Sequence, residues 1–402
     1  MNTDYDAIVV GARCAGSTTG MLLAREGYRV LIVDRATFPS DTLSTHVIHP
    51  PGVAALDRWG LLDRVVATGC PPLETYSFDF GHFTISGRPR AADGHAAAYA
   101  PRRTVLDKIL VDAAREAGAE VREGFNVDEV LRENGVAVGV RGHGDGREER
   151  LTARVVIGAD GRNSRVARAV GSIAYNEKPR LQWSHYAYFR GLPVAGFETF
   201  IRPDRGFAAA PTNDGLTMLV VGWPYRESGD YKSDVEGNFL ATLDLVPEFA
   251  ARVRGAERVS DFLGGAVPNF FRTPYGPGWA LVGDAGHNKD PLTAQGISDA
   301  FRDAEQCTAA VAAWLRGTTS YDDAMSAWQR RRDEEVAPMY EFTTQLATLE
   351  PPPPEMQQLL GTIAGSPAAM DAFVSVNAGT LSPAAFFAPD NIGALMSAGV
   401  SG

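Results

Sequence analysis

The hydrophobic pattern near the start of the chain predicts a strand, a tight turn and a helix, followed by a second strand. Residues 6–10 are an acid followed by four apolar residues, residues 11–16 contain the turn glycines, and apolar positions at helical spacing continue through residue 25. A second predicted strand covers residues 29–33, in which an arginine precedes four apolar residues. Short continuous apolar runs are typical of buried strands, and a helix between two of them predicts a βαβ unit.

Two later stretches repeat the order of strand, glycine turn and helix. Residues 153–161 form an apolar run that ends in a turn, and residues 278–297 contain a strand, a glycine-acid turn and a helix from about Gly296. Each strand ends on an acid, Asp160 or Asp284. A single acid of this kind could simply cap the following helix, as Asp commonly does. Two of them, downstream of a βαβ loop, favour a nucleotide site instead.

Between these stretches the pattern changes to a period of two, which predicts a separate sheet. Residues 186–190, 198–201 and 217–222 are rich in β-branched and aromatic side chains. The prolines at 351–354 end any helix, and the apolar, alanine-rich residues beyond them predict a helical cover. We therefore expect an α/β fold: a three-layer dinucleotide-binding domain (1–75, 98–173 and 272–345), an inserted, mostly antiparallel substrate-binding sheet (76–97 and 174–271), and a helical C-terminal cover (346–402).

The first glycine turn has the features of a dinucleotide-binding loop. Gly11 permits the tight turn, Gly16 lets helix and strand pack closely, and the helix N-terminus offers free N–H groups to a pyrophosphate. Asp34 follows Gly16 by eighteen residues, at the place where a ribose hydroxyl needs an acceptor. Arg13 replaces the usual middle glycine. Its backbone N–H or its guanidinium could still meet a phosphate, or it is a surface arginine that merely fits.

Together the three motifs resemble those of the flavoprotein monooxygenase superfamily, which includes para-hydroxybenzoate hydroxylase, geranylgeranyl reductases and flavin-dependent halogenases. The resemblance covers roughly residues 5–345. It implies that the first loop binds the ADP half of FAD, that the second motif lies near the pyrophosphate and takes part in NAD(P)H use, and that the third contacts the ribityl chain. An arginine before the predicted helix 106–117 matches one that touches FAD in that family. The residues expected to bind FAD are Gly11, Arg13, Cys14, Ala15, Gly16, Asp34, Arg35, Arg103, Asp160, Gly161, Gly283, Asp284, Gly296 and Ile297.

The inserted sheet is expected to cover the flavin ring and to hold the substrate. Some of its many aromatic side chains must be core residues, and the rest favour an apolar or aromatic small molecule. The loop of residues 39–51 leads back toward the flavin, so His46 is the candidate for handling a proton, with simple packing as the alternative. His287 could also line the pocket. The residues expected at the substrate are His46, His49, Trp183, Tyr188, Phe200, Trp223 and Pro291.

The resemblance implies several reactions. The leading hypothesis is a single-component monooxygenase, in which NAD(P)H reduces FAD and the flavin C4a-hydroperoxide formed with O2 hydroxylates the substrate. The alternative is a flavin-dependent reductase of C=C bonds. A halogenase is less expected, because no lysine precedes Lys108 and residues 222–225 do not match the Trp-x-Trp-x-Ile-Pro segment of those enzymes. A non-enzymatic flavin-binding role is the remaining class.

Composition and charge argue against other classes. The net charge of −11 works against nucleic-acid binding. Cys14, Cys70 and Cys307 lack metal-ligand spacing, so we expect no metal. No apolar stretch reaches the length of a membrane helix, and the first six residues hold two acids and no base, so neither a membrane span nor a signal peptide is expected. We expect a cytoplasmic protein whose oligomeric state is not readable.

Overall fold

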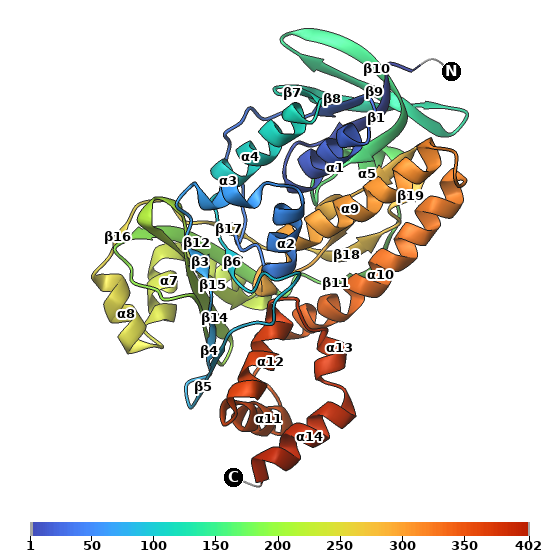
Figure 1. Cartoon of the computed structure of the whole chain (residues 1–402). Coiled ribbons are helices and arrows are strands. Elements are labelled where there is room, and N and C mark those ends of the chain that lie inside the picture. The colour runs from blue at the N-terminus through green and yellow to red at the C-terminus, as the bar shows by residue number, and fades with distance from the viewer. Residues whose placement is uncertain (1–2, 401–402) are drawn as a thin grey trace.

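The computed structural model describes residues 3–400 and contains a central sheet with five parallel strands (Figure 1). Residues 1, 2, 401 and 402, at the outer ends of the predicted first and last domains, lie outside the described residues. Val9 pairs with Ile32 on one side and with Ile157 on the other, and all three are fully buried. Burial on both faces explains the continuous apolar runs. In spatial order the strands are β7 (Glu120–Arg122), β2 (Val30–Val33), β1 (Tyr5–Val10), β10 (Arg147–Gly158), β20 (Trp279–Leu281) and the antiparallel β19 (Tyr275–Gly276).

Helices cover one face of this sheet and an antiparallel ribbon covers the other. On the helical face, one apolar cluster joins β1, β2 and β10 to α1 (Cys14–Arg25), α4 (Arg103–Glu116) and α9 (Gly296–Leu315). On the opposite face, a second cluster includes β8 (Asn126–Glu133) and β9 (Val136–Gly144), which pair with the outer part of β10. The result is a three-layer domain. Smaller elements complete it: α2 (Pro50–Arg58), α3 (Leu62–Val66), α5 (Arg165–Val170), and the strands β3 (Pro72–Leu73), β6 (Ala98–Tyr99), β11 (Ala174–Lys178), β18 (Asn269–Arg272) and β21 (His287–Asn288).

The second large sheet is antiparallel except where β13 runs parallel to β4. One of its faces packs against three short helices, α6 (Ser228–Ser233), α7 (Val235–Leu243) and α8 (Pro247–Arg254). The other face carries Tyr186, Tyr188, Leu216 and Met218 and is turned toward the first domain. Its strands are β4 (Tyr76–Asp79), β5 (Thr84–Gly87), β12 (Gln182–Arg190), β13 (Phe197–Arg202), β14 (Arg205–Pro211), β15 (Leu216–Pro224), β16 (Glu257–Arg258) and β17 (Leu263–Gly265).

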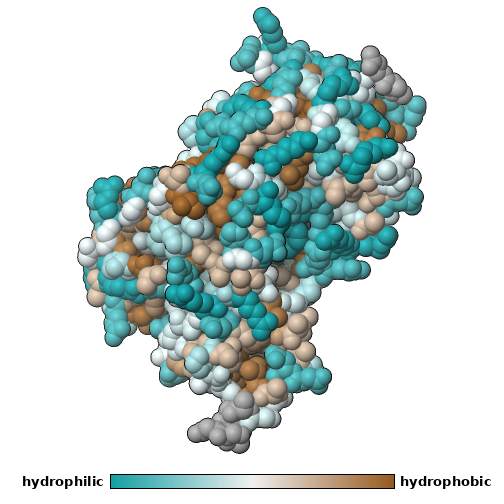
Figure 2. All heavy atoms as spheres, viewed as in Figure 1, coloured by the Kyte–Doolittle hydropathy of each residue, from teal (hydrophilic) through white to brown (hydrophobic). Residues whose placement is uncertain are grey.

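The C-terminal helices lie at the opposite end of the molecule from the N-terminus (Figure 1). The long helix α10 (Tyr321–Leu346) runs beside α9 and leads to α11 (Pro354–Ala364), α12 (Pro367–Asn377), α13 (Pro383–Phe386) and α14 (Pro389–Val400). These helices share an apolar cluster with β4 and β5, so they cover the edge of the second sheet. The face shown in Figure 2 is mostly hydrophilic, with apolar residues scattered among the polar ones.

The fold class predicted from the sequence is confirmed. No single helix within residues 3–400 has the length and apolar composition of a membrane span; α11 and α12 reach them only jointly, across a bend of 119°. The predicted helix over residues 106–117 begins three residues earlier, at Arg103. The exact domain boundaries remain a prediction.

Candidate functional site

A cavity of about 710 Å³ extends from the glycine turn after β1 to the face of β12 that carries Ser184 and Tyr186. The first domain lines most of it, through the turn after β1, the end of β2, the turn after β10, and the chain from Gly283 to the start of α9. Residues 42–45, Arg103 and residues 125–127 complete this part of the wall. The second sheet contributes the wall at the far end. The three motifs predicted from the sequence therefore meet at one cavity, as the carboxyl ends of neighbouring parallel strands should.

The glycine turn is shaped by two close backbone approaches. Gly11 has φ of +107°, which disfavours any side chain, and a Cβ there would overlap the carbonyl oxygen of Ala159. A Cβ on Gly16 would overlap the carbonyl oxygen of Gly11. No side chain within the described residues caps the N-terminus of α1, so its first N–H groups face the cavity mouth. Gly11, Arg13, Cys14 and Ala15 line the cavity, while Gly16 shapes it from behind.

Arg13 is held by the protein. Its guanidinium contacts the fully buried carboxylate of Asp107 at 2.5 Å and donates to the hydroxyl of Ser40 at 2.8 Å. Arg103 donates to the same carboxylate at 2.8 Å, and the Cys14 thiol lies 3.5 Å from it. Two arginines thus share one buried acid that the sequence gave no reason to select. Arg13 retains a negative φ of −93°, so its backbone N–H remains available to a phosphate.

Asp34 and Asp160 already accept hydrogen bonds from the backbone. Asp34 accepts from the N–H groups of Ala12 at 2.7 Å and Ala36 at 2.8 Å, and it lines the cavity beside Arg35. Asp160 accepts from the N–H of Arg165 at 2.6 Å and from the Ser164 hydroxyl at 2.5 Å. The cap that was the simple interpretation of Asp160 is therefore present, although Asp160 and Gly161 also line the cavity.

Asp284 differs from both of these acids. Its carboxylate makes no hydrogen bond or ion pair with any residue between 3 and 400. Its side chain is exposed, because it opens on the cavity. Burial raises the pKa of Asp284, and the nearby side chains of His287, Arg162 and Arg103 oppose that rise. An unpartnered carboxylate in such a place is a strong acceptor for ligand hydroxyl groups.

The N-terminus of α9 closes the same end of the cavity. Gly296 and Ile297 line the wall, and no side chain of the described residues caps the helix. A Cβ on Gly296 would meet no protein atom within 4 Å, so the backbone N–H groups there stand open to a ligand. The helix dipole makes this a favourable place for negative charge.

The residues expected at the substrate lie in several different places. Pro291 lines the cavity. Phe200 and Trp223 point to the other face of the sheet, where they pack against α6–α8, because side chains alternate between faces along a strand. Trp183 also packs there and donates from its indole N–H to Nδ1 of His185 at 3.1 Å. The sequence identified the sheet but not the orientation of its strands.

His46 and His49 are buried behind the cavity wall. Nε2 of His46 lies 2.6 Å from the Tyr188 hydroxyl, and burial and Arg103 lower the pKa of His46 to about 3. The ring of His49 bridges the Tyr76 hydroxyl at 2.8 Å and the carbonyl of Thr293 at 3.0 Å. The structure does not bring either ring into the cavity wall. His287, in contrast, lines the cavity, with Nε2 3.9 Å from Asp299.

The sheet wall is formed by residues that the sequence did not single out. Ser184 and Tyr186 project from β12, Val220 projects from β15, and Gly264 and Gly265 come from β17. The Tyr186 hydroxyl is buried and has no hydrogen-bond partner among residues 3–400. Alternation along β12 was the available signal, since residues 182, 184, 186 and 188 share one face.

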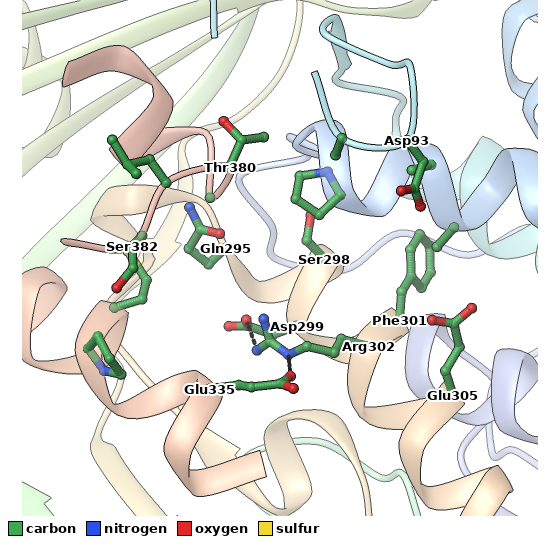
Figure 3. A pocket seen from close by; sticks show the side chains of 18 of the residues that line it. Asp93, Gln295, Ser298, Asp299, Phe301, Arg302, Glu305, Glu335, Thr380 and Ser382 are labelled. Carbon is green, nitrogen blue, oxygen red and sulfur yellow. Dashed lines mark hydrogen bonds and ion pairs between the residues drawn. The ribbon is translucent and has the colours of Figure 1, made fainter. Parts of the chain in front are cut away.

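A second cavity, of about 360 Å³, lies behind α9, between α2 and α10 (Figure 3). Its charged side chains pair with one another: Arg58 with Glu305, and Arg302 with Asp299 and Glu335. Among the described residues that line this cavity, no charged side chain is unpaired as Asp284 is. The larger cavity is therefore the candidate functional site.

The comparisons with known proteins agree with this geometry. A family model described as an FAD binding domain matches residues 4–343. The chain belongs to this FAD-binding family. It is 30% identical to digeranylgeranylglycerophospholipid reductase 2 of Methanopyrus kandleri over 309 residues, and this aligned region covers 73% of each chain. It is 28% identical over 349 residues to 6-methylpretetramide 4-monooxygenase of Streptomyces rimosus, covering 82% of this chain and 80% of the relative.

Among solved structures, the flavin-dependent brominase Bmp2 has the same fold, with a TM-score of 0.81, 18% identity and 98% coverage of both chains. Membership in the FAD-binding family makes the protein an FAD-dependent oxidoreductase, so the predicted superfamily and enzyme class are confirmed. The residues of the cavity fit FAD. The unpartnered Asp284 carboxylate suits ribityl hydroxyls, and the open N-termini of α1 and α9 suit the pyrophosphate and an electron-rich ring edge.

Proposed function

We propose that the protein is a single-component monooxygenase that uses NAD(P)H and O2 to hydroxylate an aromatic small molecule. The observation that carries this proposal is the sheet wall of the cavity. It combines the flat ring of Tyr186, whose buried hydroxyl has no partner among the described residues, with the hydroxyl of Ser184 and the apolar side chain of Val220. A planar molecule with polar substituents matches such a wall better than a long saturated chain does.

In this proposal FAD supplies the redox chemistry, by accepting two electrons and passing them to O2. The protein binds and orients the cofactor. Asp284 would accept from the ribityl hydroxyls, and the N-terminus of α9 at Gly296 would stabilise negative charge on the reduced ring. The second sheet would cover the ring and exclude water from the reacting atoms.

The choice of NAD(P)H as electron donor is supported by a group of arginines at the cavity. Arg35, Arg162, Arg165 and Arg168 all line it, and none of them forms an ion pair with a residue in the described range 3–400. Most arginines of this acidic chain are paired, so unpaired ones beside Asp160-Gly161 provide positive charge for a phosphate-bearing molecule.

The test is oxygen uptake and NAD(P)H oxidation by the FAD-loaded protein across a panel of phenols and polyketide-like aromatic compounds. At least one compound should stimulate both rates and appear as a product one oxygen atom heavier. No compound doing so would contradict the proposal.

Reduction of C=C bonds is the second candidate, because the relative with 30% identity is named a digeranylgeranylglycerophospholipid reductase. Anaerobic consumption of reduced FAD by a prenyl lipid, with no oxygen requirement, would establish that reaction instead.

A further inference from the structure

A second carboxylic acid faces the cavity. Asp290 is 1% exposed and lines the wall between Asp284 and the start of α9. Its Oδ1 accepts hydrogen bonds from the side-chain amide of Gln182 and from the N–H of Leu292. Its Oδ2 has no hydrogen-bond partner among the described residues. Oδ1 is thus fixed by the protein, while Oδ2 is buried without a partner at the cavity wall that the residue lines.

The elements packed around Asp290 offer it no cation. From β12 it meets the neutral amide Gln182, and from β18 the side-chain oxygen of Asn269 accepts from its backbone N–H at 2.7 Å. The adjacent Lys289 is committed to Asp299. Burial raises the pKa of Asp290 to about 7, and the hydrogen bonds from Leu292 and Gln182 only partly offset this rise. Near neutral pH a large fraction of Asp290 therefore carries a proton on an otherwise unpartnered oxygen.

We propose that Asp290 is a further catalytic residue, a neutral acid that donates a proton to the reacting atoms in the cavity. The inference rests on the proposed monooxygenase function. Hydroxylation of a substrate R–H consumes one R–H, one O2, one NAD(P)H and one H⁺, and it yields R–OH, water and NAD(P)⁺. The O–H bond of Asp290 breaks as its proton joins the oxygen atom that leaves as water, and solvent then returns a proton to the carboxylate.

The position of Asp290 on a short helical turn does not account for both of its oxygens. Oδ1 alone caps the turn, through Leu292, and the same atom accepts from Gln182. A purely structural acid would have no need for a buried second oxygen without a partner, because leaving such an atom unpaired costs stability. An asparagine would cap the turn equally well through its carbonyl oxygen.

The decisive variant is therefore Asp290→Asn, which keeps the cap and the shape but cannot donate a proton. Turnover should fall by about a hundredfold or more, the usual scale for a lost general acid, while FAD affinity stays the same. Wild-type turnover should decline as the pH rises through about 7, because the acid form is lost, and the variant should lack that limb. Asn269→Ala is the matched control: it removes the support of the Asp290 N–H but leaves the carboxyl, so the pH limb should persist.

A readout independent of activity is the infrared C=O stretching band of a protonated carboxyl in the FAD-loaded protein. The band should be present below a pH of about 7 in the wild type, fade above it, and be absent in Asp290→Asn. A variant with wild-type turnover and an unchanged pH profile would overturn the inference even if hydroxylation is observed. If no compound is hydroxylated but the titrating band is present and lost in the variant, the proposed function fails while the neutral acid stands.

Discussion

Replacement of Asp284 should have opposite effects on the free protein and on cofactor binding. In the free protein Asp284→Ala removes a cavity-facing carboxylate that no described residue pairs with. Burial raises its pKa, so its charged form disfavours folding. Below the ordinary pKa of a carboxyl, Asp284 is protonated in the folded and unfolded states alike and this penalty is absent. The penalty grows as the pH rises from there and is fully present above the raised pKa of the folded protein. The variant without FAD should therefore be at least as stable as the wild type at neutral pH.

FAD binding should weaken in the same variant. A hydrogen bond to a charged group contributes about 1.5–3 kcal/mol, which corresponds to a loss of about tenfold to about a hundredfold in affinity. The assay is a titration of the FAD-free protein, followed by visible absorbance, together with thermal unfolding of the free protein.

Asp34→Ala is the matched comparison. Asp34 accepts from the N–H groups of Ala12 and Ala36, so its loss leaves backbone donors unsatisfied and should destabilise the free protein by about 1–3 kcal/mol. The reasoning is refuted if Asp284→Ala binds FAD as tightly as the wild type, or if it destabilises the free protein as much as Asp34→Ala does.

Three further outcomes are expected. Gly16→Ala forces a Cβ into the carbonyl oxygen of Gly11, so no FAD should be bound in an absorbance titration of protein that remains folded by circular dichroism. His46→Ala should raise KM by about tenfold with little change in kcat, because His46 packs behind the cavity wall. A loss of kcat of about a hundredfold in steady-state assays would instead identify His46 as a catalytic residue. Burial lowers the pKa of His46 to about 3 and that of His49 to about 4, so both rings are neutral in the folded protein. The free energy of unfolding, measured in urea, should therefore fall below pH of about 6.5 by about 1.4 kcal/mol per histidine for each pH unit. A flat profile down to pH of about 5 would contradict this.

The parallel sheet and its turns were predictable because each is specified locally. Residues 7–10 and 30–33 are apolar without interruption, and the close approach at Gly16 allows no side chain. These local requirements led to the motifs around Gly11, Asp160 and Asp284, and the structure places all three at one cavity.

The substrate wall was not predictable in the same way, because the orientation of a strand depends on what packs against each face. Trp223 and Tyr186 belong to paired strands, and only the helices α6–α8 decide that the tryptophan faces away from the cavity. The pairing of Arg13 with Asp107 joins residues far apart in the sequence, so no local pattern indicated it. The same holds for the contact between Gln182 and Asp290.

The most direct test of the account is a crystal structure of the protein with FAD. The account predicts one FAD in the cavity, with its adenosine ribose beside Asp34, its ribityl hydroxyls within hydrogen-bonding distance of Asp284, and its ring between the N-terminus of α9 and Tyr186. Density for the ring outside this cavity, or a ribityl chain that makes no contact with Asp284, would contradict it.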